Sequence, residues 1–170
     1  MATVTLKGNP VALTGNEVNV GDVAPEVTVV ATDLSEKKVG GAKGVVQVLI
    51  SVPSLDTPVC ATETRKFNEV VSQIPGVDVT VISMDLPFAS KRFCSTEGIE
   101  NLTCASDFRN KEFGQKYGVL IAEGPLAGIL ARAIFVVGKD GKVVYKQIVP
   151  EITEEPNYDE VLEAVKKANA

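Results

Sequence analysis

Two long apolar runs separated by an amphipathic segment dominate the pattern of hydrophobic and polar positions. Residues 45–52 form a nearly unbroken run rich in valine, which is typical of a central strand covered on both faces. Apolar residues then recur at i, i+3, i+4 and i+7 from Phe67 and predict a helix that the Pro75-Gly76 pair ends. Residues 77–84 form a second apolar run. We therefore expect a strand–helix–strand unit with a parallel crossover.

Shorter predicted strands and helices flank this unit on both sides in the sequence. We expect strands at residues 3–6, 11–13, 27–32, 102–105, 133–138 and 143–149, and helices at 87–98, at 107–117 and after residue 157. The first two of these strands form an N-terminal hairpin, and the last two form a hairpin around the Asp140-Gly141 turn. Segments 35–44 and 121–128 are expected to be loops because they contain glycine and few periodic apolar positions.

Capping residues mark the ends of the later helices. Asp107 is expected to cap helix 107–117, and Gly118 to close it. Asn157 and Glu160 resemble a capping box at the start of the last helix. Together the elements predict an α/β sandwich with a mixed central β-sheet flanked by helices. The 170 residues are sufficient for one domain, spanning residues 1–170.

Charge and hydropathy indicate which partners and which locations of the protein are expected. The chain has 17 Lys and Arg against 22 Asp and Glu, a net charge of −5, and no basic run longer than two residues. Neither a nucleic-acid surface nor an anionic-membrane surface is expected. No apolar run approaches the roughly 20 residues of a membrane span, and the first ten residues lack the pattern of a secretory signal. We expect a cytoplasmic protein.

The absence of histidine restricts the chemistry further. It removes cysteine–histidine and serine–histidine–aspartate catalysis, together with zinc sites that need imidazole. The three cysteines, Cys60, Cys94 and Cys104, form no C-x-x-C motif, so we expect no metal. Their odd number and sparse spacing favour a reducing compartment over a secreted disulfide scaffold.

Cys60 is the candidate nucleophile. Thr57 is a good N-cap residue, and Pro58 suits the first helical position, so Cys60 falls in the first turn of the predicted helix. Unpaired backbone N–H groups and the helix dipole favour a thiolate there. The alternative is that Cys60 is a small buried hydrophobe, as cysteines often are.

Two motifs give the chain a family resemblance. Pro53-x-x-x-Thr57-x-x-Cys60 at the end of a strand resembles the active-site pattern of peroxiredoxins, and residues 85–94, DLPFASKRFC, resemble the resolving-cysteine segment of their thiol peroxidase subfamily. The similarity runs over nearly the whole chain. It implies a thioredoxin-like fold with an added N-terminal β-hairpin, and a homodimer.

The resemblance also implies an activity: thiol-dependent reduction of hydrogen peroxide and organic hydroperoxides, without a metal or organic cofactor. Cys60 would be the peroxidatic cysteine, and Cys94 the resolving cysteine that closes an intramolecular disulfide, which a thioredoxin-like dithiol reduces. Thr57 would hydrogen-bond the thiolate or the peroxide, Pro53 would shape the pocket, and Arg132 would stabilise the thiolate and orient the peroxide. Bridging Cys60 and Cys94 would require both helical segments to loosen.

Each of these residues also has a purely structural interpretation. Thr57 could be a helix cap alone, Pro53 could simply end a strand, and Arg132 could be a surface arginine at a strand edge. Cys94 could be a packed helix cysteine. Cys104 is expected to be inert in a buried strand, although it could compete as a resolving thiol.

Other residues near the motifs leave further alternatives open. Glu63 would oppose thiolate formation if it pointed at the sulfur, and Arg65 is expected to be a solvated helix charge. Leu86, Pro87, Phe88 and Phe93 could form an apolar rim for organic hydroperoxides, or core and dimer contacts. At the level of function, the alternatives are a thioredoxin-fold redox sensor and a partner-binding domain with inert cysteines.

Overall fold

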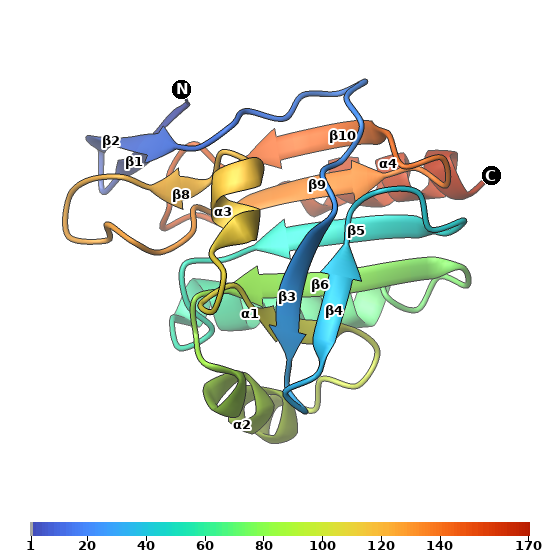
Figure 1. Ribbon diagram of the computed structural model, residues 1–170. Coiled ribbons are helices and arrows are strands. Elements are labelled where there is room, and N and C mark those ends of the chain that lie inside the picture. Colours follow the sequence, from blue (N-terminus) through green and yellow to red (C-terminus); the bar gives the residue numbers. More distant parts are fainter. Residues whose placement is uncertain (1) are drawn as a thin grey trace.

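The structure, a computed structural model, describes residues 2–170 and contains two β-sheets (Figure 1). The main sheet has seven strands in the order β10-β9-β5-β6-β7-β3-β4, and a smaller sheet has the order β1-β2-β8. The strands are β1 (Thr3–Leu6), β2 (Asn9–Thr14), β3 (Val27–Ala31), β4 (Glu36–Val39), β5 (Val46–Ser51), β6 (Val77–Ser83), β7 (Thr103–Ser106), β8 (Leu120–Ile121), β9 (Ala133–Val137) and β10 (Val143–Ile148). The helices are α1 (Pro58–Val70), α2 (Pro87–Glu97), α3 (Glu112–Lys116) and α4 (Tyr158–Asn169).

Helices cover both faces of the main sheet. In the view of Figure 1, α3 lies in front of the sheet and α1 and α4 lie behind it, while α2 lies beyond its lower edge. Buried side chains accordingly form two clusters, one around Phe113 and Tyr117 of the α3 region and one around Phe67 of α1 and Val161 of α4. Strand β5 is buried along its whole length, as its apolar run predicts. The predicted sandwich with a mixed sheet and an N-terminal hairpin is confirmed.

The directions of the strands confirm both predicted hairpins and the parallel crossover. Strand β5 pairs in parallel with β6, and β6 with β7, whereas β9 and β10 pair antiparallel. Parallel strands bring their carboxyl ends to one edge of a sheet, which is where catalytic loops are commonly found. The segments that follow β5 and β6 therefore start side by side.

The prediction that residues 35–44 form a loop is wrong in part. Residues Glu36–Val39 form β4, which pairs antiparallel with β3 at the edge of the main sheet. Only Val39 of this strand is buried. An edge strand needs little hydrophobicity, and charged residues at an edge discourage pairing with other chains, so the hydrophobic pattern did not reveal it.

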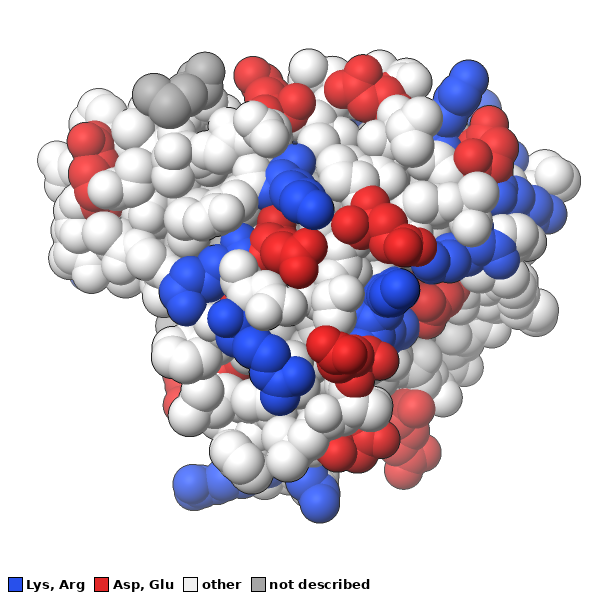
Figure 2. All heavy atoms as spheres, in the orientation of Figure 1, with Lys and Arg blue, Asp and Glu red and all other residues white. Residues whose placement is uncertain are grey.

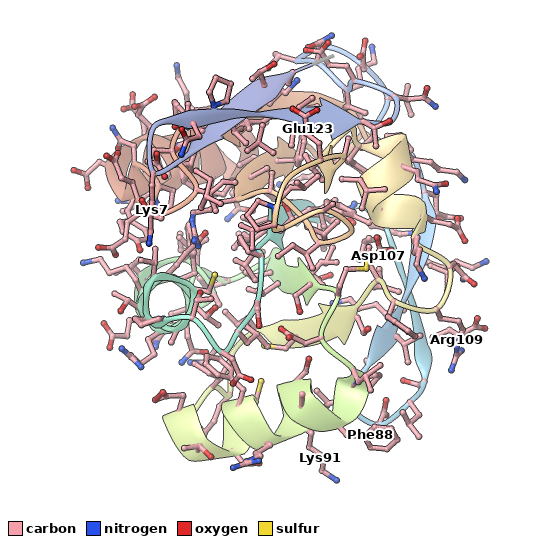
Figure 3. The ribbon with its side chains drawn as sticks, turned by 90° about the vertical axis from the view of Figure 1, so that its left-hand side faces the viewer. Lys7, Phe88, Lys91, Asp107, Arg109 and Glu123 are labelled. Atoms are coloured by element: carbon pink, nitrogen blue, oxygen red, sulfur yellow. The ribbon has the colours of Figure 1, made fainter. Side chains whose placement is uncertain are left out.

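The helix predicted for residues 107–117 is also wrong at its start. Helix α3 covers only Glu112–Lys116, and the residue at its N-cap, Lys111, has a left-handed backbone with φ of 56°. The buried carboxylate of Asp107 nevertheless accepts hydrogen bonds from the N–H groups of Phe113 and Gly114, both at 2.9 Å. Figure 3 shows Asp107 between β7 and this helix. Asp107 thus binds the first turn from outside the helix.

Two further predictions concern the ends of elements. The loop predicted at 121–128 begins inside β8, whose two residues pair with β2. The cap predicted at Asn157 is confirmed, because its side chain accepts a hydrogen bond from the N–H of Glu160 at 3.1 Å.

Acidic and basic side chains are interspersed on the face shown in Figure 2. Among residues 2–170, no helix combines the length and the apolar character needed to cross a membrane.

Candidate active site

Cys60 lies in the first turn of α1, where the sequence placed it. The helix begins at Pro58, and Thr57 is its N-cap, with its side-chain oxygen accepting a hydrogen bond from the N–H of Cys60 at 3.3 Å. The cysteine is fully buried. Its sulfur therefore lies near the positive end of the helix dipole, in a site that excludes water.

The Thr57 hydroxyl is engaged with the backbone on both sides. It accepts from the N–H of Cys60 and donates to the carbonyl oxygen of Ser54 at 3.0 Å. The capping role is therefore present in this structure. A hydrogen bond from Thr57 to a peroxide would require the hydroxyl proton to turn away from Ser54.

Asp85 ties the loop that carries Thr57 to the end of β6. Its carboxylate accepts hydrogen bonds at 2.8 Å from the Ser54 hydroxyl, the Leu55 N–H and the Ser83 hydroxyl. The same loop contains Pro53, which is buried. The sequence assigned Asp85 only to the segment preceding Cys94, so its role as an anchor was missed. A carboxylate directly after a buried strand was the available signal.

The register of two antiparallel strands brings Arg132 to Cys60. Ser51, the last residue of β5, pairs with Ala133, the first residue of β9. The Ser51 hydroxyl also donates to the Ala131 carbonyl at 2.7 Å. Arg132 therefore lies beside the loop that follows β5, and its Nη1 donates to Cys60 Sγ at 3.2 Å.

Three further hydrogen bonds hold the Arg132 guanidinium in place. Its Nε and Nη2 donate to the Ile152 carbonyl at 3.2 and 2.8 Å, and Nη1 also donates to Glu63 Oε1 at 2.7 Å. The arginine is only 2% exposed. Burial by itself lowers the pKa of Arg132, but the negative charges of Glu63 and Cys60 outweigh it and leave this pKa raised. The site thus holds a fixed cation against a buried sulfur, an arrangement that stabilises a thiolate.

Glu63 completes this cluster, and the sequence left open whether its side chain points at the sulfur. It lies three residues after Cys60, on the same face of α1, but its carboxylate contacts Arg132. Its second oxygen, Oε2, has no hydrogen-bond partner within residues 2–170. Burial raises the pKa of Glu63 to about 7, although Arg132 acts in the opposite direction. The carboxyl group therefore changes charge near neutral pH.

This titration predicts a pH-dependent stability. A group whose pKa is raised from 4.5 to about 7 on folding stabilises the native state below pH 4.5, and that contribution is lost as the pH rises through 7. Chemical denaturation should show the unfolding free energy of the wild type falling by up to about 3 kcal/mol relative to Glu63→Gln over this interval. Glu69→Gln, an exposed change on the same helix, should behave as the wild type. Parallel curves for the wild type and Glu63→Gln would contradict the assignment.

Cys94 lies on α2, and the cysteine it contacts is Cys104 rather than Cys60. All three cysteines are free thiols, and Cys94 is half-buried. A hydrogen bond from the Cys104 thiol lowers the pKa of Cys94, while burial raises it. The structure therefore brings Cys60 and Arg132 together and leaves Cys94 in a separate contact.

A hollow of about 490 Å³ separates α1 from α2. Thr57, Pro58 and Ala61 line one side of it, and Phe93 contributes to the other. Leu86, Pro87 and Phe88 line a different groove, so only Phe93 of the expected apolar rim borders the hollow between α1 and α2. A salt bridge of 3.0 Å between Arg65 and Glu97 joins the two helices, so Arg65 is not simply a solvated charge.

Comparisons with known proteins show the family of the chain. The redoxin family model matches residues 19–162. A thiol peroxidase from Aquifex aeolicus is 67% identical over 165 residues, which cover 97% of each chain. A thiol peroxidase from Campylobacter jejuni is 62% identical over 157 residues, covering 92% of this chain and 89% of the other.

Solved structures show the same similarity. A crystal structure of a peroxiredoxin-like protein from Aquifex aeolicus has a TM-score of 0.96 and 66% identity, and the match covers 99% of this chain and 98% of the other. A thiol peroxidase from Chromobacterium violaceum has a TM-score of 0.87 at 20% identity, with 97% and 95% of the two chains covered. At that identity the second match supports the fold alone.

Proposed function

The chain belongs to the thiol peroxidases of the redoxin family, a class of thiol-dependent peroxidases, and we propose that Cys60 is its peroxidatic cysteine. The observation that supports this assignment is the contact of 3.2 Å between Arg132 Nη1 and Cys60 Sγ at the start of α1. The resemblance drawn from the two sequence motifs is confirmed at the level of the family and of the enzyme class.

In the proposed reaction, the Cys60 thiolate attacks one oxygen of the hydroperoxide, and the O–O bond breaks. Cys60 becomes a sulfenic acid, and the second oxygen leaves as water or an alcohol after taking up a proton. Arg132, held by Ile152 and Glu63, is positioned to stabilise negative charge on the sulfur and on the leaving oxygen. Thr57 and Pro53 shape the approach to the sulfur. Hydrogen peroxide and organic hydroperoxides are the proposed substrates.

Resolution would use Cys94. Its thiolate attacks the Cys60 sulfenic sulfur and releases water, which leaves an intramolecular Cys60–Cys94 disulfide. Because Cys94 contacts Cys104 in the structure, α2 must first detach from its position and break the Arg65–Glu97 salt bridge. A partly exposed pair of this kind contributes about 1 kcal/mol, so it is a weak restraint. A thioredoxin-like dithiol in the cytoplasm would then reduce the disulfide.

Replacing Cys94 tests this scheme. After one equivalent of hydrogen peroxide, Cys94→Ser should stop at a sulfenic acid on Cys60, because serine cannot complete the disulfide. Peptide mapping by mass spectrometry should find a Cys60–Cys94 bridge in the wild type at early times. Turnover with a thioredoxin system should fall by at least about 100-fold in the variant. Wild-type turnover in Cys94→Ser would exclude Cys94 as the resolving thiol, and no turnover in the wild type would favour a redox sensor.

The proposed homodimer has a candidate surface beside α2. Phe88 is 68% exposed, Phe108 51% and Leu34 48%, and together with Leu86 they border a groove. Figure 3 shows Phe88 pointing outward next to the β3–β4 turn. Exposed apolar side chains clustered in this way are typical of a protein interface.

Phe88→Asp should weaken this dimer, because it places a charge among apolar contacts. We expect the dissociation constant to rise by at least about 10-fold, measured by sedimentation equilibrium. Val144→Asp, an exposed position on β10 at the opposite edge of the sheet, is the matched control and should leave the dimer intact. A monomeric wild type, or equal dissociation constants, would contradict this interface.

A further inference from the structure

Cys94 and Cys104 form a second pair of thiols that the proposed reaction does not use together. Cys94 lies on α2 and Cys104 on β7, and the helix packs against this strand. Each thiol is close enough to the other to shift its pKa, lowering that of Cys94 and raising that of Cys104. Cys104 is only 2% exposed, and both residues belong to the apolar cluster on the Cys60 side of the sheet. The packing of α2 on β7 thus already makes the two thiols neighbours in the folded protein.

The two possible disulfides of Cys94 differ in what they require of the fold. A bridge to Cys60 displaces α2, opens the first turn of α1 and breaks the contact between Cys60 and Arg132. A bridge to Cys104 joins thiols that are adjacent when both helices are in place. Disulfide exchange runs toward the bridge that the folded structure favours. The fold therefore favours oxidation of the Cys94–Cys104 pair.

We infer that Cys104 is a second resolving thiol, which takes over the disulfide from Cys60. In this step the Cys104 thiolate attacks the Cys94 sulfur of the Cys60–Cys94 disulfide. The Cys94–Cys104 bond forms, the Cys60–Cys94 bond breaks, and Cys60 leaves as a thiolate. One disulfide replaces another, so no oxidant or reductant is consumed, and the Cys104 proton passes to solvent. The inference rests on the proposed Cys60–Cys94 disulfide.

The surroundings of the three sulfurs set the direction of this exchange. A thiol that is stabilised as a thiolate leaves faster, and Cys60 returns to a site with Arg132 Nη1 at 3.2 Å. Before oxidation Cys104 does not compete, because the contact with Cys94 and burial raise its pKa and keep it protonated. Displacement of α2 during formation of the first disulfide uncovers Cys104. Cys104 would thus become reactive only after Cys94 has left it.

The migrated disulfide would also remain accessible to a reductant. Cys94 borders a hollow of about 310 Å³, which Thr32, Lys91, Ser95 and Glu100 help to line. Figure 3 shows Lys91 pointing outward from α2. An external dithiol could therefore attack the Cys94 sulfur while α1 stays folded and Cys60 is ready for another peroxide.

The test is a titration with hydrogen peroxide in the absence of a reductant. Wild type and Cys104→Ser are acid-quenched at intervals, their free thiols are alkylated, and their bridges are mapped by mass spectrometry. In the wild type, the Cys60–Cys94 bridge should appear first and then decline as Cys94–Cys104 grows. The regenerated Cys60 should react again, so the wild type should consume about two equivalents of peroxide, whereas Cys104→Ser should consume about one. Cys104→Ala serves as a second variant, and thermal unfolding confirms that each protein is folded.

The outcomes separate the two proposals. If Cys60–Cys94 is the final bridge in the wild type and about one equivalent is consumed, the migration is wrong while the proposed reaction stands. A Cys60–Cys104 bridge would likewise overturn the migration, because Cys104 would then attack Cys60 directly. If Cys60 is never oxidised or never bridges to Cys94, the proposed function itself fails.

Discussion

Cys60→Ser is expected to abolish peroxidase activity, with a loss of at least about 10,000-fold in the rate constant for reaction with hydrogen peroxide. A serine hydroxyl is almost entirely un-ionised near neutral pH, and oxygen is a far weaker nucleophile than a thiolate toward peroxide. Neither the helix N-terminus nor Arg132 can replace the sulfur as the nucleophile that attacks the peroxide. Cys94 and Cys104 cannot substitute, because neither contacts Arg132 in the structure.

Stopped-flow measurement of peroxide consumption is the direct check on this change. Thr62→Ser, an exposed substitution in the same turn of α1, is the matched control and should retain wild-type rates. Thermal unfolding should show that both variants are folded, since Cys60 and serine are similar in size. If Cys60→Ser lost thiols to peroxide as fast as the wild type, Cys60 would not be the nucleophile.

Arg132→Lys is expected to lower the same rate constant by about 100- to 1,000-fold, the usual effect of removing a fixed donor from a transition state. Lysine keeps the positive charge, but it cannot reach Cys60, Glu63 and the Ile152 carbonyl at once as the guanidinium does. The loss would therefore measure geometry rather than charge alone. Arg109→Lys, at an exposed position, should leave the rate unchanged.

Folding is the main concern with this substitution, because breaking a buried ion pair typically costs about 3–5 kcal/mol. The double variant Arg132→Lys with Glu63→Gln removes the unpaired carboxylate and separates stability from catalysis. If the double variant is folded and still slow, the guanidinium geometry is required for the reaction. A rate within about threefold of the wild type in either folded variant would contradict the role assigned to Arg132.

Much of the fold could be predicted because its signals are local. Apolar runs, helical spacing and the residues Thr57 and Pro58 determine where β5, β6 and α1 lie, and they place Cys60 in the first helical turn. The exceptions are elements that depend on a neighbour. Strand β4 is held by pairing with β3, and α3 is held by a carboxylate outside the helix. Their own residues carry little periodic pattern.

The active site shows the same difference between local signals and contacts with distant parts of the chain. The sequence by itself determined the nucleophile and its cap, since both lie within four consecutive residues and act through the backbone of one helix. The tertiary structure alone decided that Arg132 contacts Cys60, that Glu63 faces Arg132, and that Cys94 meets Cys104. These contacts follow from the register of β5 with β9 and from the packing of α2 on β7. Such long-range alignments arise when the core closes, so no local pattern in the chain records them.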